Sequence, residues 1–221
     1  MKPTPLEQTA LYKIFRPWIE QLRPFLKPRK FEEGRYLYHE SEPAERFWTV
    51  RSGEVRTLKA SASGRVITLE TLHAGDPFGM AALRADALYT ESAQAITACE
   101  AWCVPRRVVV SLMAKDPEVS RALLAIVAGR LQRAHDRLCS FAHDSVAARM
   151  ARALLDSADD ERIETTRRVL GESAGTTVET AIRVLRRFEK AHWIEGGVGW
   201  VRILDRPALE NIARGGEDSE I

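Results

Sequence analysis

Residues 165–193 read TTRRVLGESAGTTVETAIRVLRRFEKAHW, and this stretch decides the fold of the C-terminal part of the chain. It predicts a short helix with Thr165 or Thr166 as N-cap, because a hydroxyl there can accept a hydrogen bond from a free backbone N–H group. Gly175 then permits a left-handed turn, and a second helix is predicted over residues 178–193. Two helices joined by a short turn with glycine are typical of a helix-turn-helix.

The apolar spacing indicates how these two helices pack on each other. Leu170 and Ala174 of the first helix are predicted to face inward, and the small Ala181 is expected where the helices cross closely. Further inward positions follow at helical spacing in the second helix, namely Val184, Leu185 and Phe188. The opposite face of the second helix is left for a partner or for solvent.

The start of the second helix carries candidate base-reading residues. Glu179 and Arg183 are four residues apart and share a helix face away from the apolar stripe. In a helix-turn-helix, residues at this place reach base edges in the major groove. Arginine can bind guanine through two hydrogen bonds, and glutamate can accept one from cytosine N4. An ordinary surface ion pair between Glu179 and Arg183 is the alternative interpretation.

Other polar side chains of this region are predicted to contact DNA phosphates. Thr166 lies at the N-terminus of the first helix, where free N–H groups favour an anion. Arg187 and Lys190 lie where the second helix leaves the groove. The predicted phosphate contacts are Thr166, Arg167, Thr176, Thr177, Thr180, Arg187 and Lys190.

The stretch EGGVGWVRILD, residues 195–205, predicts a two-stranded hairpin, since glycines mark its turn and apolar residues flank it. Such a hairpin is the wing of a winged helix and touches the phosphate backbone. Residues 206–213 are predicted to form a last short helix. The acidic residues 217–221 are predicted to be a frayed tail.

Residues 30–105 have a different texture, in which short runs alternate apolar and polar residues. Examples are RFWTVRSGEVRTLKA, residues 46–60, and RVITLETLHAGD, residues 65–76. Short strands at such spacing predict a small antiparallel sandwich or barrel. Glycines that would supply positive φ angles or close approaches are Gly34, Gly53, Gly64, Gly75 and Gly79.

Helical periodicity returns after residue 105. Residues 108–119 are predicted to hold a short helix, with Pro117 in the first turn of the next helix, which is the longest in the chain. Apolar residues repeat along it at spacings of three and four, the heptad seam of a two-helix coiled coil. The alternative is a helix packed on its own domain. The predicted dimer seam consists of Leu124, Val127, Leu131, Ala134, Leu138 and Phe141.

Three shorter segments complete the prediction. Residues 5–26 are predicted to form an amphipathic helix or helix pair. Asp144 or Ser145 is a plausible N-cap for a helix that starts at residue 146. Residues 157–164, SADDERIE, are predicted to be a polar loop.

Composition limits the classes of function. The chain has 221 residues, of which 45% are hydrophobic and 29% charged, as in ordinary globular proteins. Its net charge of +2 excludes a generally basic coat for nucleic acid, so any basic surface must be local. Apolar runs long enough for a membrane span and a signal peptide pattern are absent from the sequence, which predicts a cytoplasmic protein with no membrane partner. The common hydrolase, metalloprotease and nucleotide-binding motifs are also absent, which predicts a protein that is not an enzyme.

The chain contains 3 cysteines, Cys99, Cys103 and Cys139, without CxxC spacing. This excludes a disulfide framework and argues against a structural zinc site, so no metal ligands are predicted. An iron–sulfur cluster normally needs four cysteine ligands, which one chain does not supply. Each cysteine is predicted to be a small buried or half-buried hydrophobic residue.

The ordered set of motifs resembles the bacterial cyclic-AMP receptor protein / fumarate–nitrate regulator (CRP/FNR) family of transcription factors. The resemblance covers nearly the whole chain and rests on FEEGRYLY (31–38), LETLHAGDPFGM (69–80) and the helix-turn-helix sequence above, among others. It implies an α+β protein with an N-terminal antiparallel β-roll of the cupin-like double-stranded β-helix type. It further implies a homodimeric regulator of transcription that binds a palindromic operator in double-stranded DNA, with RNA polymerase as a further candidate partner.

The resemblance also implies a division of the chain into three parts. Residues 1–115 are expected to form an effector domain similar to cyclic-nucleotide-binding domains. Residues 116–143 are expected to form the dimerisation helix, and residues 144–221 the winged helix-turn-helix domain that binds DNA.

This sequence departs from the family pattern at the positions that would bind the effector. In members that bind cyclic nucleotides, a Gly-Glu pair holds the ribose 2′-hydroxyl and a later arginine neutralises the phosphate. Here the pair is Gly79–Met80, and residues 87–91 offer no cation. Burying a phosphate without a cation costs several kcal/mol, so we expect a signal other than cyclic AMP or cyclic GMP. By position, the predicted effector pocket consists of Gly79, Met80, Ala81, Tyr89, Thr90, Ala134 and His135.

The cofactor is left open by the sequence. Redox members of the family hold an iron–sulfur cluster on N-terminal cysteines, but here no cysteine precedes Cys99, so no cluster is expected. Haem-sensing members exist, and a haem-based sensor or a cyclic-nucleotide-binding regulatory module are the alternative functions. A lone histidine is more often a surface or core residue than a ligand. The candidates for a haem ligand are His39, His73, His135, His143 and His192.

The second helix of the helix-turn-helix departs from the family too. Where the family often shows Ser-Arg-Glu-Thr, residues 177–180 read Thr-Val-Glu-Thr. Val178 is a candidate for contact with a thymine methyl group, or for capping the core between the helices. The predicted base contacts are thus Val178, Glu179 and Arg183, and the DNA half-site is expected to differ from the usual one.

Overall fold

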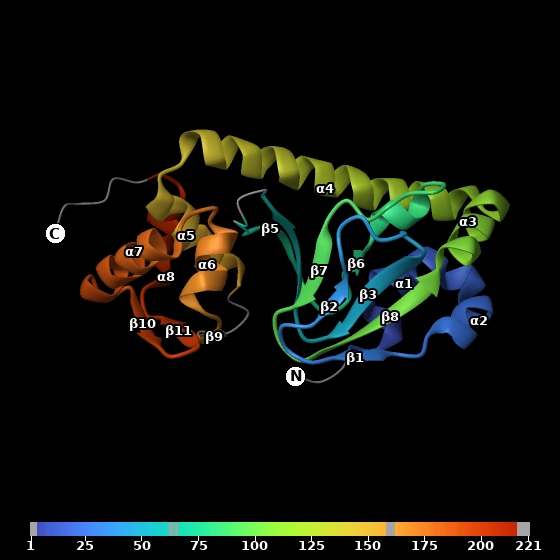
Figure 1. Cartoon of the computed structure of the whole chain (residues 1–221), viewed down its shortest axis with the longest axis horizontal. Helices are drawn as coiled ribbons and strands as arrows, with labels where there is room; N and C mark the ends of the chain where they lie inside the picture. Colours follow the sequence, from blue (N-terminus) through green and yellow to red (C-terminus); the bar gives the residue numbers. More distant parts are fainter. Residues whose placement is uncertain (1–3, 62–63, 65, 158–161, 216–221) are drawn as a thin grey trace. The chain divides into compact units, whose positions relative to one another are not determined.

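The computed structural model describes residues 4–61, 64, 66–157 and 162–215 (Figure 1). The chain divides into two compact units, Met1–Arg65 with Leu69–Gln132, and Val66–Thr68 with Arg133–Ile221. The predicted tail, residues 217–221, lies outside the described residues.

Antiparallel strands dominate the N-terminal half of the chain, as the alternating pattern predicts. Within the described residues they form two four-stranded sheets, in the orders β1-β8-β3-β6 and β2-β7-β4-β5. The central pairing joins β3 to β8 and aligns Trp48 with Cys103. The strands are β1 Arg29–Phe31, β2 Tyr36–Tyr38, β3 Arg46–Ser52, β4 Val55–Ala60, β5 Val66–Leu72, β6 Pro77–Phe78, β7 Ser92–Ala95 and β8 Cys99–Pro105.

Glycines turn the chain between these strands. The prediction of positive φ at the five glycines from Gly34 to Gly79 is confirmed, with φ angles of 77, 76, 77, 100 and 70° in chain order. Gly53 is the most restricted, because a Cβ atom there would lie 2.5 Å from the carbonyl oxygen of Ala98. The tight turn between β3 and β4 therefore depends on a residue without a side chain.

Aromatic rings fill the interior between the strands. Tyr38 and Tyr89 stack with ring centroids 3.7 Å apart, and Trp48 and Phe78 stack at 6.0 Å. The Tyr89 hydroxyl accepts a hydrogen bond from Nε1 of Trp48 at 3.1 Å and donates one to the carbonyl of Arg46 at 2.8 Å. Since the polar ends of Trp48 and Tyr89 are satisfied, these two rings are fixed parts of the core.

The N-terminal segment forms short helical pieces instead of one continuous helix. Pro17 and Pro24 lie at the starts of two 3₁₀ turns, where they remove the backbone donors that a longer α-helix needs. The pieces bury Leu11, Phe15 and Leu22 in a second core cluster. They comprise turns η1 Leu6–Gln8, η2 Arg16–Trp18 and η3 Arg23–Phe25 and helices α1 Ala10–Phe15 and α2 Ile19–Leu22.

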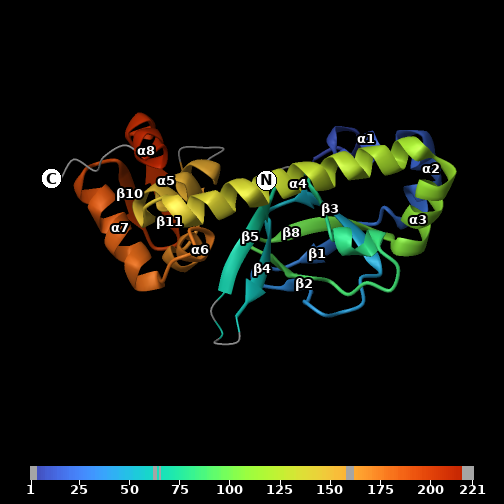
Figure 2. The same ribbon diagram turned by 90° about the horizontal axis from the view of Figure 1, so that it is seen from above.

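Two helices follow the β structure. The predicted short helix is α3, Arg106–Lys115, and the long helix is α4, Pro117–His143, which starts at Pro117 as predicted. Val119 and Leu123 near its start are buried, whereas most of its later apolar residues are not. Figure 2 shows α4 as one uninterrupted helix. A 3₁₀ turn, η4 Met80–Leu83, follows β6.

The C-terminal residues form helices around a small sheet. Ser145, one of the two predicted candidates, is the N-cap of α5, and its hydroxyl accepts a hydrogen bond from the N–H of Ala148. Phe188, Leu154 and Leu209 lie in the shared core. The elements are α5 Val146–Asp156, β9 Arg162–Glu164, α6 Arg167–Ser173, α7 Val178–Lys190, β10 Ile194–Gly197, β11 Trp200–Ile203 and α8 Arg206–Ala213.

Two predictions about this region are wrong in detail. The predicted polar loop 157–164 contains strand β9, whose Ile163 is buried and pairs with Val201 of β11; residues 158–161 lie outside the described residues. The second helix of the helix-turn-helix ends at Lys190 and not at Trp193, because His192 adopts a φ of 59°. The wing consequently has three strands, in the order β10-β11-β9.

Candidate nucleic-acid interface

Helices α6 and α7 form the predicted helix-turn-helix. Thr166 caps α6 by accepting a hydrogen bond from the N–H of Val169 at 3.2 Å, and Thr177 caps α7 in the same way from Thr180 at 3.2 Å. Gly175 between them has a φ of 62°, the left-handed conformation that the sequence predicts. The turn is thus defined by two hydroxyl caps and one glycine.

All predicted inward residues of the two helices are buried. A Cβ atom at Gly171 would lie 3.2 Å from the Cβ of Ala181, so these two residues mark the close crossing. The sequence identified Ala181 as the crossing residue but missed Gly171. The buried set is Leu170, Ala174, Ala181, Val184, Leu185 and Phe188.

The predicted base-reading residues lie exposed at the start of α7. Val178, Glu179 and Arg183 all face solvent. Within the described residues, Glu179 and Arg183 form no ion pair with each other. The Glu179 carboxylate instead accepts hydrogen bonds from its own N–H and from the Thr177 hydroxyl, and these lower its pKa. The polar contact of the Arg183 guanidinium in the described part of the chain is with the hydroxyl of Thr180, at 3.5 Å.

The predicted phosphate contacts surround this pair. Thr166, Thr177 and Lys190 are exposed, while Thr176 and Thr180 are half-buried. Arg187 is exposed as well. Arg167 lies 3.9 Å from the carboxylate of Glu189, so this carboxylate partly balances the positive charge of Arg167. Exposed Arg186, absent from the predicted set, has no ion-pair partner among the described residues. The spacing of three residues between Arg183 and Arg186 could have indicated Arg186 from the sequence.

The wing carries two arginines beside an aromatic ring, and Arg162 is paired with Glu164 at 3.0 Å. The guanidinium of Arg162 lies 4.6 Å from the ring centroid of Trp200, and that of Arg202 lies 6.0 Å from it. Arg202 also pairs with Glu195 at 2.5 Å. Val198 at the tip between β10 and β11 is 98% exposed. The strands therefore hold cations against an aromatic face beside an unpacked tip.

An exposed apolar stripe follows α4. Leu124, Leu131 and Leu138 are 67%, 57% and 66% exposed, and Val127 and Ala134 are exposed too. Phe141, the last predicted seam residue, differs because its ring lies against the turn of the helix-turn-helix: a Cβ atom at Gly175 would be 2.4 Å from its Cε1. A monomer would leave this stripe in water, whereas a coiled-coil partner would cover it.

The residues predicted for the effector pocket do not share one environment. Tyr89 belongs to the aromatic core, and Gly79 is buried with a φ of 70°. The Met80 side chain packs on the cluster around α3, and that of Ala81 on the β core. Thr90 is exposed and donates a hydrogen bond to the carboxylate of Glu91.

The remaining two predicted pocket residues, Ala134 and His135, are exposed on α4. The sequence missed a cation that α4 supplies near the predicted pocket. Arg130 donates a hydrogen bond to the carbonyl of Pro77, two residues before Gly79, and pairs with Glu70 at 3.4 Å. Its charge is therefore already balanced by a carboxylate.

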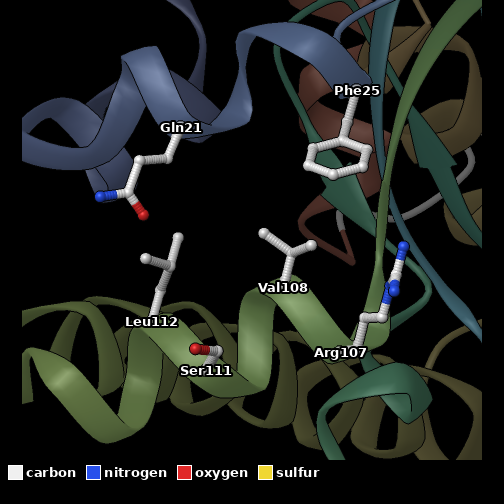
Figure 3. Close-up of a pocket in the computed structure, with 6 residues that line it drawn as sticks. All are labelled: Gln21, Phe25, Arg107, Val108, Ser111 and Leu112. Carbon is white, nitrogen blue, oxygen red and sulfur yellow. The ribbon is translucent and has the colours of Figure 1, made fainter.

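A groove lies elsewhere in the same unit, between the N-terminal pieces and α3 (Figure 3). Its volume is about 460 Å³, and its apolar lining consists of Phe25 on one side and Val108 and Leu112 of α3 on the other (Figure 3). Gln21, Arg107 and Ser111 complete its lining. None of the residues predicted for the effector pocket lines this groove.

The cysteines and histidines lie apart. Cys99 and Cys103 are buried as predicted, and burial raises the pKa of Cys99 to about 11, so its thiol is protonated at neutral pH. The prediction for Cys139 is wrong, because this residue is exposed beside Leu138 on α4. His39 stacks on Tyr36 with ring centroids 4.3 Å apart. Among the described residues, no group of three potential ligands is arranged to hold a metal ion.

No helix of the described residues is both long and apolar enough to cross a membrane.

Comparison with known proteins agrees with this geometry. The family model for the cyclic nucleotide-binding domain matches residues 28–116, and that for the Crp-like helix-turn-helix domain matches residues 148–212. The HTH-type transcriptional regulator Cmr of Mycobacterium tuberculosis is 28% identical over 91% of this chain and 82% of its own length. The CRP-like cAMP-activated global transcriptional regulator of the same species is 29% identical over 89% of this chain and 92% of its own length.

A solved structure shows the same fold. FixK2 from Bradyrhizobium japonicum superposes with a TM-score of 0.76 and 26% identity, over 85% of this chain and 96% of that one. The match extends through the β structure, the long helix and the helix-turn-helix, and so covers the order of elements predicted from the sequence.

Proposed function

The chain belongs to the CRP/FNR family of bacterial transcription regulators, and we propose that it acts as a homodimer that binds a palindromic operator in double-stranded DNA. In this proposal residues 1–115 sense a signal, residues 116–143 dimerise and residues 144–221 bind DNA. The protein works in the cytoplasm without catalytic activity of its own, and RNA polymerase is a further candidate partner.

The observation that carries the proposal is the start of α7. Glu179 and Arg183 are exposed on one helix face and do not neutralise each other. The carboxylate keeps acceptor capacity for cytosine N4, and the guanidinium keeps its donors for guanine O6 and N7. Val178, the third proposed base contact, adds an exposed apolar surface for a thymine methyl group. A surface ion pair would have left neither charged group available.

The exposed stripe of α4 supports the dimer. Exposed leucines at heptad spacing are costly in a monomer, since each buried leucine contributes roughly 1.5–3 kcal/mol relative to exposure. A parallel two-fold dimer would cover the stripe from both chains and place two copies of α7 on symmetric half-sites.

The signal is proposed to be something other than cyclic AMP, although one relative in Mycobacterium tuberculosis is named as cAMP-activated. Met80 stands where a carboxylate would hold the ribose, and residues 87–91 bring no cation. The guanidinium of Arg130, which donates a hydrogen bond to the carbonyl of Pro77, is paired with Glu70. A cyclic phosphate would therefore meet no unpaired cation from these residues.

Selection from a library of random duplexes tests the proposal. The purified dimer should enrich a palindrome whose half-sites lie about 10–11 base pairs apart from centre to centre, or a multiple of that distance. The Glu179→Ala, Arg183→Ala double variant is the matched control, because both residues are exposed and their loss leaves the core intact. Failure of the wild-type protein to enrich any sequence would overturn the proposal.

A further inference from the structure

The turn of the helix-turn-helix, residues Ser173–Gly175, is contacted by residues outside the motif. The ring of Phe141, in the last turn of α4, occupies the space that a side chain at position 175 would need: an ideal Cβ there lies 2.4 Å from Cε1 and 2.9 Å from Cζ. The ring therefore packs directly on the backbone of the turn. All residues involved belong to the same compact unit.

Two arginines add polar contacts to the same turn. Arg149 of α5 donates a hydrogen bond from Nε to the carbonyl of Ala174 at 2.9 Å. Arg137 of α4 donates one from Nη2 to the carbonyl of Ser173 at 3.0 Å. These carbonyls lie at the C-terminal end of α6, where helix carbonyls lack intrahelical partners and favour positive charge.

The three side chains are also joined to the end of α4. The guanidinium of Arg149 lies 5.4 Å from the ring centroid of Phe141, and its Nη1 donates a hydrogen bond to the carbonyl of Asp144 at 2.8 Å. Asp144 directly follows α4, so Arg149 bridges the end of that helix and the turn. This cation–π contact helps to hold the ring in place.

We infer that Phe141, Arg137 and Arg149 form a clasp that sets the position of the turn, and thereby of the first residues of α7, relative to the end of α4. The inference rests on the proposed function, because its consequence is read in DNA affinity. Only three residues separate Gly175 from Glu179, so a shift of the turn moves the proposed base contacts directly. The clasp residues are positioning residues and do not themselves contact DNA.

This assigns Phe141 a different role from the other apolar residues of its stripe. Leu138, one turn earlier, is 66% exposed, as a seam residue should be in a single chain. Phe141 is 36% exposed because its ring is occupied by the turn. Substitution of the two residues should consequently have different effects.

The test compares Phe141→Ala with Leu138→Ala. Operator affinity is measured by fluorescence anisotropy at concentrations where sedimentation shows each variant to be a dimer. Phe141→Ala should lower operator affinity about tenfold with the dimer intact, as expected for loss of one coupling contact. Leu138→Ala should weaken the dimer and leave the affinity of the assembled dimer unchanged. Phe141→Leu and Arg149→Met provide milder variants should Phe141→Ala fail to fold.

A second readout distinguishes positioning from general stability. The N–H of Thr176 donates a hydrogen bond to the carbonyl of Gly171 at 2.9 Å, and its hydrogen exchange reports on the turn. Phe141→Ala should speed exchange at Thr176, whereas Leu138→Ala should not. Gly175→Ala should also lose less affinity in the Phe141→Ala background than in wild type, because the ring no longer blocks the methyl group.

The inference fails if Phe141→Ala weakens the dimer as Leu138→Ala does while the assembled dimer keeps its affinity and its protection at Thr176. It also fails if the effects of Phe141→Ala and Gly175→Ala simply add. A wild-type dimer that binds no DNA would instead overturn the proposed function. The two failures are therefore distinguishable.

Discussion

The guanidinium of Arg130 on α4 lies 3.4 Å from the carboxylate of Glu70 on β5. The same guanidinium donates a hydrogen bond to the carbonyl of Pro77, two residues before Gly79 of the predicted effector pocket. Both side chains are largely shielded, with exposed fractions of 18% and 25%. The positive charge of Arg130 is therefore committed to a carboxylate and to the backbone.

Cyclic nucleotides should consequently not bind. Titration calorimetry with cyclic AMP and with cyclic GMP should show no heat of binding at micromolar concentrations, because Met80 offers no acceptor for the ribose and Arg130 is paired. Glu70→Gln, which frees Arg130 but adds no acceptor for the ribose, is the control variant. Micromolar affinity of the wild-type protein would contradict the interpretation of these residues.

Dimerisation should depend on Leu131. Leu131→Glu would place a charge in the centre of the seam in both chains, and an unpaired buried charge is strongly destabilising. Light scattering should then show a monomer or an unfolded chain. Ala125→Glu, at an exposed position of the same helix outside the stripe, should remain a dimer. A dimer of wild-type size for Leu131→Glu would show that the stripe is not the interface.

Arg183 and Lys190 should affect DNA binding differently. Arg183→Ala should cost roughly 1–3 kcal/mol and relax the preference at one base pair of each half-site. Lys190→Ala should weaken binding to all sequences about equally and reduce the dependence on salt. Both effects are measurable on a selected operator and its single-base variants at several salt concentrations. Equal weakening of all sequences by Arg183→Ala would make Arg183 a phosphate contact.

Substitutions at two glycines should distinguish the cost of backbone strain from the cost of a steric clash. Gly34 and Gly53 have φ angles of 77 and 76°, but a Cβ at Gly34 would meet nothing within 4 Å, whereas one at Gly53 would meet Ala98 and Cys99. Gly34→Ala should therefore cost only about 1–2 kcal/mol of conformational strain. Gly53→Ala should cost more than about 3 kcal/mol in urea unfolding. Similar losses for both variants would show that the strand–strand turn can relax.

Most of the fold could be predicted from the periodicity of apolar residues and from the helix-capping residues. The stripe from Leu170 to Phe188 is buried as its spacing predicts, and Thr166 and Ser145 cap the helices at which they were expected. These features depend on residues close together in the sequence. The short strand β9 could not be identified in this way, because Ile163 between two charged residues is too short a pattern to distinguish a strand from a loop.

Long-range contacts of the candidate site were not predictable from the sequence. Arg130 and Pro77 are 53 residues apart, and nothing local indicates that they meet. Phe141 fits the heptad pattern as well as Leu138 does, so only the structure separates its packing on Gly175 from a place in the seam. Cys139 was expected to be buried from its residue type, but the face of α4 on which it lies is open.

The exposed tip of the wing is a suitable site for a fluorescent label. Val198 makes no packing contact that a substitution could disturb, since its side chain is 98% exposed. A cysteine introduced there and coupled to an environment-sensitive dye, in a background where the exposed Cys139 is replaced by serine, would leave the folded core undisturbed. Its emission would then report the approach of a duplex to this side of the protein in real time.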